Sequence, residues 1–141
     1  MAEFTIDGIA YKTKKLDAMT QFGIVCKLGA VLEHVKPAIQ AIAHHSTAQR
    51  LAEQSGEAGP VMDLDAFVPL GRALSALPDE SRDYIVGAVL RSTFRQNGPG
   101  FLPAWNARDN RPLDEIDFST LIQILGHALK DNLGSFTPAL A

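Results

Sequence analysis

The chain has 141 residues, of which 46% are hydrophobic and 21% are charged, and its formal net charge at pH 7 is −3. This composition excludes a disordered chain, because disordered segments combine few apolar residues with a high net charge. The negative charge argues against nucleic acid as the main partner, since affinity for a polyanion depends largely on basic surface. The single cysteine, Cys26, excludes an internal disulfide and fits a reducing compartment.

Neither a membrane span nor a leader is expected. The longest purely apolar runs, such as residues 85–90, are far shorter than the roughly 20 residues that a membrane helix requires. Residues 1–5 lack the basic and apolar regions of a signal peptide. We therefore expect a soluble cytoplasmic protein with no membrane partner, folded as one domain over residues 1–134 and followed by a tail over residues 135–141.

Residues 3–12 predict a β-hairpin. Asp7 and Gly8 form the expected two-residue turn, because a type I′ turn needs a positive φ at both positions and these residue types tolerate it. Two strands alone are marginally stable, so the apolar face of the hairpin must pack against helices. The turn sets a register that places four apolar residues on that face, with Ile6 opposite Ile9 and Phe4 opposite Tyr11.

Helical spacing begins after the hairpin. Asp17 stands where a negative charge suits a helix N-terminus, and Pro37 ends or kinks the helix. Cys26 lies within the apolar stripe of this helix and is predicted to be a small buried thiol. A second, Ala-rich helix is expected over residues 38–53. The residues of the first stripe recur every three or four positions: Leu16, Met19, Phe22, Gly23, Cys26, Gly29, Ala30 and Leu32.

Two helices are expected in the middle of the chain. Asp63 can cap the first, which reaches Leu77 and whose first turns Pro69 shortens. The second begins near Asp79, with acidic residues in its first turn. Its apolar face is wide enough to predict a central, well-covered helix that includes Tyr84, Ile85, Val86, Ala88, Val89, Leu90 and Phe94.

A long loop and a last helix complete the chain. Three prolines and two glycines within residues 97–113 indicate the loop. Asp114 or Asp117 can cap the last helix, and Gly134 can end it. Its apolar stripe is the most regular in the chain: Phe118, Leu121, Ile122, Leu125, Ala128, Leu129 and Leu133. The fold class expected from these elements is mainly α, with a small N-terminal β-hairpin followed by a bundle of four or five helices.

The sequence offers no pattern typical of a catalytic, metal or cofactor site. His44 and His45 are adjacent, so on a helix they point about 100° apart and cannot easily share a metal ion. Neither a nucleophile elbow nor a phosphate-binding glycine loop is present. The acidic clusters all lie at predicted helix N-termini, where capping accounts for them. We therefore expect a protein that is not an enzyme and holds no metal or cofactor.

Aromatic and apolar residues near the long loop are candidates for partner binding. Phe101, Leu102 and Trp105 lie between prolines, and Phe94 precedes them at the end of the predicted helix. In one interpretation the loop residues fold back over the helices as a hydrophobic lid. In the other, these side chains or a groove beside them anchor a partner, since Trp and other aromatic residues are favoured anchors.

Four segments in one order resemble phage tail assembly chaperones of long-tailed phages and Mu-like prophages. Residues 3–32 match the family's strand, tight turn and following helix with Gln21-Phe22, and residues 76–96 match its Leu-Pro-Asp helix with a later Asp-Tyr pair. Residues 101–105, FLPAW, resemble its Trp-containing loop, and residues 114–136 its final helix.

The resemblance implies a non-catalytic role in phage tail assembly. Such chaperones bind the long, largely helical tape-measure protein, keep its apolar segments soluble, recruit tail-tube subunits and are absent from the finished virion. The implied partners are therefore the tape-measure protein and the tail-tube protein, in the host cytoplasm. The wide apolar stripe of residues 84–94 adds the hypothesis of a homo-oligomer.

Two other functions stay open at this point. The loop with Phe101 and Trp105 would also suit a small helical adaptor or inhibitor of phage origin that binds a host protein. A DNA-binding regulator would use Arg82, Arg91 and Arg95, which the pattern places on one helix, although acidic neighbours of Arg82 make a solvated face the simpler interpretation.

Overall fold

A sheet, a single helix lying across it and a layer of further helices make up the part of the protein that the computed structural model describes. The described residues are 2–31, 33, 35–36, 39–40, 44, 51–52, 54–56 and 68–133. Strands β1 (Ala2–Ile6) and β2 (Ile9–Thr13) precede helix α1 (Ala18–Leu28) and the short 3₁₀ turn η1 (Gly29–Val31). The later elements are α3 (Val68–Ser75), α4 (Asp79–Arg91), β3 (Thr93–Asn97), β4 (Gly100–Pro103), β5 (Trp105–Asn106), β6 (Arg111–Pro112) and α5 (Phe118–Leu133).

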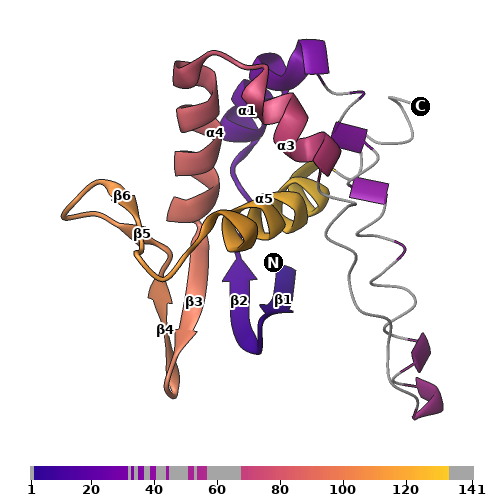
Figure 1. Cartoon of the computed structure of the whole chain (residues 1–141), viewed down its shortest axis with the longest axis vertical. Helices are drawn as coiled ribbons and strands as arrows, with labels where there is room; N and C mark the ends of the chain where they lie inside the picture. Colours follow the sequence, from indigo (N-terminus) through magenta and orange to yellow (C-terminus); the bar gives the residue numbers. More distant parts are fainter. Residues whose placement is uncertain are drawn as a thin grey trace.

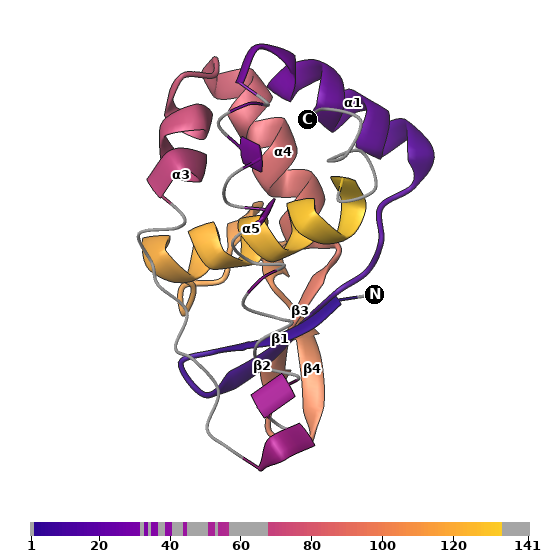
Figure 2. The same cartoon turned by 90° about the vertical axis from the view of Figure 1, so that its right-hand side faces the viewer.

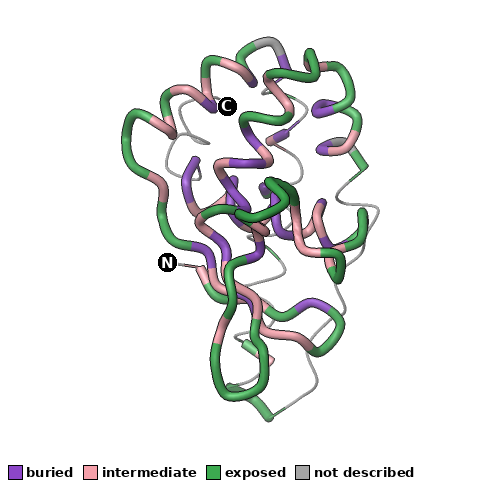
Figure 3. The backbone as a smooth tube through the Cα atoms, turned by 90° about the vertical axis from the view of Figure 1, so that its left-hand side faces the viewer, coloured by how far each residue is buried: buried purple, intermediate pink, exposed green. Residues whose placement is uncertain are grey.

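Helix α5 lies between the sheet and the other helices (Figure 1, Figure 2). It contacts β1 on one side and α3 and α4 on the other. Buried residues concentrate where the helices and the sheet meet, whereas the tip of the β3–β4 hairpin is exposed (Figure 3). Most of the predicted helix over residues 38–53 lies outside the described residues, and so do Asp63 and the tail over residues 135–141.

The N-terminal hairpin has the predicted register. Ile6 pairs with Ile9 and Phe4 with Tyr11. Asp7 and Gly8 have φ values of 51° and 79°, which the type I′ turn requires. The apolar face of the hairpin packs on the helices as expected, with Ile6 and Tyr11 buried.

The expected helical bundle is wrong, because the hairpin is half of a four-stranded antiparallel sheet in the order β1-β2-β3-β4. Helix α4 is present from Asp79 but ends at Arg91, so Phe94 lies in β3 instead of on a helix. Much of the expected loop over residues 97–113 forms β4 and the small β5–β6 ladder. Pro103 is compatible with a strand here because β4 is an edge strand, where a missing N–H breaks no inner ladder bond.

Helix α5 is the central helix of the fold. The sequence pattern had predicted that the helix beginning near Asp79 would be the central one. Asp117 caps it by accepting a hydrogen bond of 2.8 Å from the backbone N–H of Thr120. The ring of His127 stacks on Phe4 of the sheet with 4.2 Å between centroids. Its buried residues lie on several faces: Thr120, Ile122, Ile124, Leu125, Gly126, Ala128, Leu129, Asn132 and Leu133.

A buried amide joins the C-terminal end of α5 to the start of α1. Asn132 is 4% exposed, and its Oδ1 accepts hydrogen bonds from the Leu16 backbone N–H at 2.8 Å and from Gln21 Nε2 at 3.0 Å. Its Nδ2 donates to the Ala128 carbonyl oxygen at 2.8 Å. All of these groups would be costly to bury without partners, so the network sets where α1 lies.

The face of α1 that packs against the core differs from the predicted one. Ile24 and Leu28 are buried, whereas Met19 is 74% and Phe22 63% exposed. Cys26 is exposed as well, which corrects the prediction of a buried thiol. The helix carries apolar residues on more than one face, so periodicity alone cannot tell which face packs inward; contacts such as those of Asn132 decide it.

We predict that Asn132→Ala lowers the free energy of unfolding by about 1–3 kcal/mol, because it leaves the Leu16 N–H without its acceptor in a part-buried site. Urea denaturation measures the change, and Gln123→Ala, which removes an exposed amide from the same helix, is the matched control with little effect. Equal stability of Asn132→Ala and the wild type would contradict the role given to this network.

We also predict that acid destabilises the protein partly through Asp117. The hydrogen bond from the Thr120 backbone N–H lowers the pKa of Asp117 below its ordinary value. A folded-state pKa below the unfolded one stabilises the fold at pH values above about 4, and this stabilisation is lost as pH falls through the folded pKa. Asp117→Asn keeps the acceptor but does not titrate, so its melting temperature should fall less between about pH 5 and pH 2. An equal fall in melting temperature for the wild type and Asp117→Asn would refute a contribution of Asp117 to acid destabilisation.

Candidate protein-binding groove

The residues predicted to bind a partner are divided between the two faces of the sheet. Phe94 lies opposite Pro103 and Phe101 lies opposite Gln96, so both rings are on the outer face, away from α5. Leu102 lies opposite Arg95 and therefore points to the other face. The four residues do not form one patch.

Basic side chains cover the aromatic rings of this region. Lys12 Nζ lies 4.1 Å from the centroid of Phe101, and Lys14 Nζ lies 5.1 Å from that of Phe94. The guanidinium carbon of Arg91 lies 4.7 Å from the centroid of Trp105, which also packs against the buried core. These cation–π contacts stabilise the rings where they lie, and Trp105 matches the lid interpretation better than that of a free anchor.

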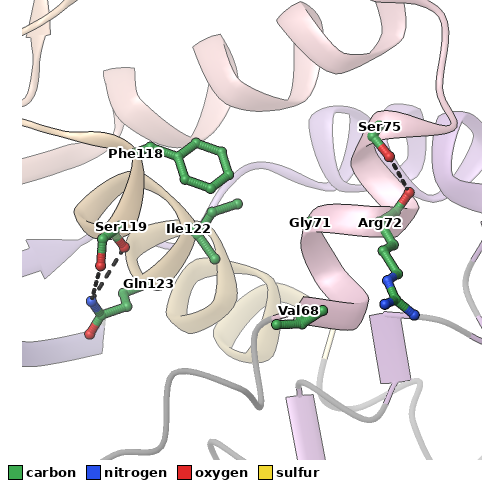
Figure 4. Close-up of a pocket in the computed structure, with 8 residues that line it drawn as sticks. All are labelled: Val68, Gly71, Arg72, Ser75, Phe118, Ser119, Ile122 and Gln123. Atoms are coloured by element: carbon green, nitrogen blue, oxygen red, sulfur yellow. Dashed lines mark hydrogen bonds between the residues drawn. The ribbon is translucent and has the colours of Figure 1, made fainter.

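An apolar groove lies instead between α3 and α5 (Figure 4). Its volume is about 390 Å³. Phe118 and Ile122 of α5 and Val68 of α3 border the same space, and Ser119 and Gln123 lie beside them on α5 (Figure 4). The Arg72 side chain extends along α3 away from Phe118 and Ile122 (Figure 4). The described residues that line it are Val68, Gly71, Arg72, Ser75, Phe118, Ser119, Ile122 and Gln123.

The groove combines a buried base with an exposed aromatic side chain. Ile122 is 8% exposed and belongs to the core, whereas Phe118 is 73% and Val68 46% exposed. Gly71 opens the α3 side, because a methyl group built there would meet no described heavy atom within 4 Å. The arrangement can receive bulky apolar side chains of a partner, the anchor type that groove-binding helices present.

Sequence reasoning placed Phe118 in the core stripe of the last helix and so missed its role at the surface. Phe118 is the first residue of α5 and follows the cap residue Asp117 directly. A side chain at this position can fit the apolar periodicity of the helix and still lie beyond the elements that pack on the helix. A large apolar residue directly after a cap is therefore the signal that could have identified it.

The arginines assigned to DNA binding do not form one basic surface. Arg82 pairs with Asp79 at 3.2 Å and with Asp83 at 3.5 Å. Arg91 covers Trp105, and Arg95 lies in β3 instead of on the helix with the other two. The prediction that these arginines share a helix is therefore wrong for Arg95.

The described residues contain no group of three or more histidine, cysteine, aspartate or glutamate side chains that could hold a metal ion. Within the same part of the chain, no helix is both long enough and apolar enough to cross a bilayer.

Comparison with known proteins identifies the family. No curated protein and no solved structure matches the chain significantly. A family model described as phage tail assembly chaperone protein matches residues 7–140, which is nearly the whole chain and includes both helices of the groove. This match confirms the resemblance found in the sequence, and the chain belongs to the phage tail assembly chaperone family.

Proposed function

We propose that the protein binds apolar helical segments of the tape-measure protein in the groove between α3 and α5. The observation that carries this proposal is the exposure of Phe118 beside the buried Ile122 in an apolar depression of about 390 Å³. A tape-measure chain without its tube exposes apolar helix faces to water, and covering them keeps the chain soluble. The proposed role is non-catalytic and belongs to the host cytoplasm during assembly, not to the finished virion.

The size of the groove suits a reversible chaperone. A few anchor side chains would bury a modest apolar area, and such contacts carry most of the energy of a small interface. Binding limited to a few anchors at many sites along a long helical chain can be displaced step by step as tube subunits polymerise. A groove of this size is therefore better suited to transient binding of tape-measure segments than to a permanent complex.

We propose that recruitment of the tail-tube protein uses a separate surface, since both partners must be held together. The outer face of the sheet, with Phe94 and Phe101 under Lys14 and Lys12, lies on the side of the sheet away from α5. This proposal keeps Phe94 and Phe101 as partner-binding residues, whereas Leu102 and Trp105 lie apart from them.

We predict that Phe118→Ser abolishes the capture of tape-measure fragments while the fold stays intact. The protein is co-expressed with overlapping fragments of the tape-measure protein encoded by the same phage, and the soluble fragment that co-purifies is measured. Leu51→Ser, which removes an apolar side chain of 60% exposure from outside the groove lining, is the matched control and should retain the fragments.

The melting temperature of Phe118→Ser should change little, because the ring is 73% exposed. A tail-tube protein added to the same co-expression should stay bound to Phe118→Ser. If Phe118→Ser and Val68→Ser both retain tape-measure fragments at the wild-type level, the groove is not the binding site.

We further propose that the protein self-associates through α1. The exposed residues of α1 and its C-cap carry no charge, and they are Ala18, Met19, Phe22, Cys26 and Gly29. An apolar face of this kind on the surface marks an interaction site. This surface replaces the stripe of residues 84–94 as the reason to expect a homo-oligomer, because Ile85, Val89 and Leu90 are buried within one chain.

We predict that Phe22→Ser shifts the protein toward the monomer, because it removes the largest exposed apolar side chain of α1. Light scattering over a range of protein concentrations measures the mass, and Leu51→Ser, at an exposed apolar residue outside α1, is again the control. A monomeric wild type at high concentration would refute self-association.

A further inference from the structure

We infer that two copies of this protein associate through antiparallel α1 helices, with the large exposed residues of each helix packed against the small exposed residues of the other. This inference rests on the proposed self-association and goes beyond it, because it specifies the direction and the register of the two helices. The observation that starts it is the unequal size of the exposed residues along α1.

The exposed residues form one stripe along α1, on the side opposite to the buried Ile24 and Leu28. They recur every three or four positions, which places them on one face of the helix. None of them is charged, so a second apolar surface can cover the stripe without burying an ion. From the N-terminal end they are Met19, Phe22, Cys26 and Gly29.

The stripe is bulky in its N-terminal half and shallow in its C-terminal half. Met19 is 74% and Phe22 63% exposed, so both side chains project into water. Cys26 has a small side chain and Gly29 has none. A Cβ built at Gly29 would meet no described heavy atom within 4 Å, so the space above it is open. The two halves are therefore complementary in shape to each other and not to themselves.

A two-fold axis at the middle of the stripe brings the unlike halves together. Phe22 and Cys26 are equally far in sequence from position 24, and the same holds for the outer pair, Met19 and Gly29. A two-fold contact uses the same patch on both copies, so this axis sets each large residue opposite a small residue of the second copy. Phe22 then meets the sulfur of Cys26, a favourable contact for an aromatic ring.

A second copy in the antiparallel direction is thus the occupant that the stripe fits best. Parallel helices would instead press the two Phe22 rings together and leave a gap between the two Gly29 residues. The helix dipoles add to this preference, because antiparallel helices place unlike ends side by side. Helix α1 has 11 residues and is about 16 Å long, so the contact is small and the dimer reversible.

Disulfide trapping between two differently tagged full-length chains tests the direction of the helices. One chain is the wild type, with Cys26, and the other carries Phe22→Cys together with Cys26→Ser, so each chain has one thiol. Antiparallel helices bring the thiols of unlike chains opposite each other. The thiols of like chains are then about 6 Å apart along the axis in addition to the distance between the helices, which exceeds the reach of a disulfide.

We therefore expect oxidised glutathione to link unlike chains about tenfold faster than like chains. The matched control chain carries Leu51→Cys with Cys26→Ser, because its thiol lies at an exposed position outside α1. This control should link to the wild type no faster than two wild-type chains link to each other.

Gly29→Leu tests the same register without a covalent link. The new side chain fills the space that receives Met19, so the dissociation constant from sedimentation should rise about tenfold. Gly71→Leu is the control, since a Cβ there also meets nothing within 4 Å but lies outside α1. Met19→Ala combined with Gly29→Leu should restore association, because it moves the bulk from one half to the other. Parallel helices predict stronger association for Gly29→Leu, since two leucines would fill the gap between the glycines.

Four results would overturn the inference. Links between like chains as fast as those between unlike chains would assign parallel helices, and a dimer without links through these thiols would assign another surface; self-association stands in both cases. A wild type that is monomeric at every concentration would reject self-association together with the inference. If co-expressed tape-measure fragments or tail-tube protein, and not a second copy, protect Cys26 from alkylation by iodoacetamide, the stripe belongs to that partner.

Discussion

Burial of α5 on several faces is the constraint on which the rest of the structure depends. Residues such as Ile124, Leu125 and Leu129 are at most 1% exposed, because the sheet covers one side of the helix and α3 and α4 cover the other. Each of these elements is short, and none could bury its own apolar face alone. At the C-terminal end Asn132 adds hydrogen bonds to Leu16 and Gln21, so that α1 is held as well.

The same constraint produces the groove. The buried part of α5 begins near Thr120 and Ile122, whereas Phe118 in the first turn is left in contact with water. Helix α3 lies beside that turn, and Gly71 keeps the space between the two helices open. Helix α5 thus offers the well-packed Ile122 as the base of the groove and the exposed Phe118 as a contact for a partner. A partner can bind there without rearrangement of the fold.

A chaperone must expose apolar surface without aggregating, and this protein limits that risk in two ways. On the outer face of the sheet, lysine side chains lie over Phe94 and Phe101 and keep charge next to the rings. At the groove, the amide of Gln123 and the hydroxyl of Ser119 lie beside the apolar part (Figure 4). The exposed face of α1 lacks such charges, which is why self-association is proposed there and not elsewhere.

Local signals were predicted well because their partners are close in sequence. The Asp7–Gly8 turn, the hairpin register, Asp17 at the start of α1 and Asp117, one of two candidate caps of α5, depend on residues within a few positions of each other. The order of such motifs also indicated the family that the comparison shows. What the sequence could not reveal was the pairing of β2 with β3, which places Tyr11 opposite Arg95, and hence the sheet that replaced the expected bundle.

The amino-acid sequence by itself determined the turn, the start of α4 and the family of this protein, and it placed the starts of α1 and α5 to within a few residues. Only the tertiary structure decided which apolar side chains are buried: Ile24 instead of Phe22 on α1, and Ile122 but not Phe118 on α5. The physical reason is that burial depends on which distant element covers a face, and an apolar stripe wider than its neighbour leaves some of its residues in water. In this protein those uncovered residues form the surfaces proposed to bind its partners.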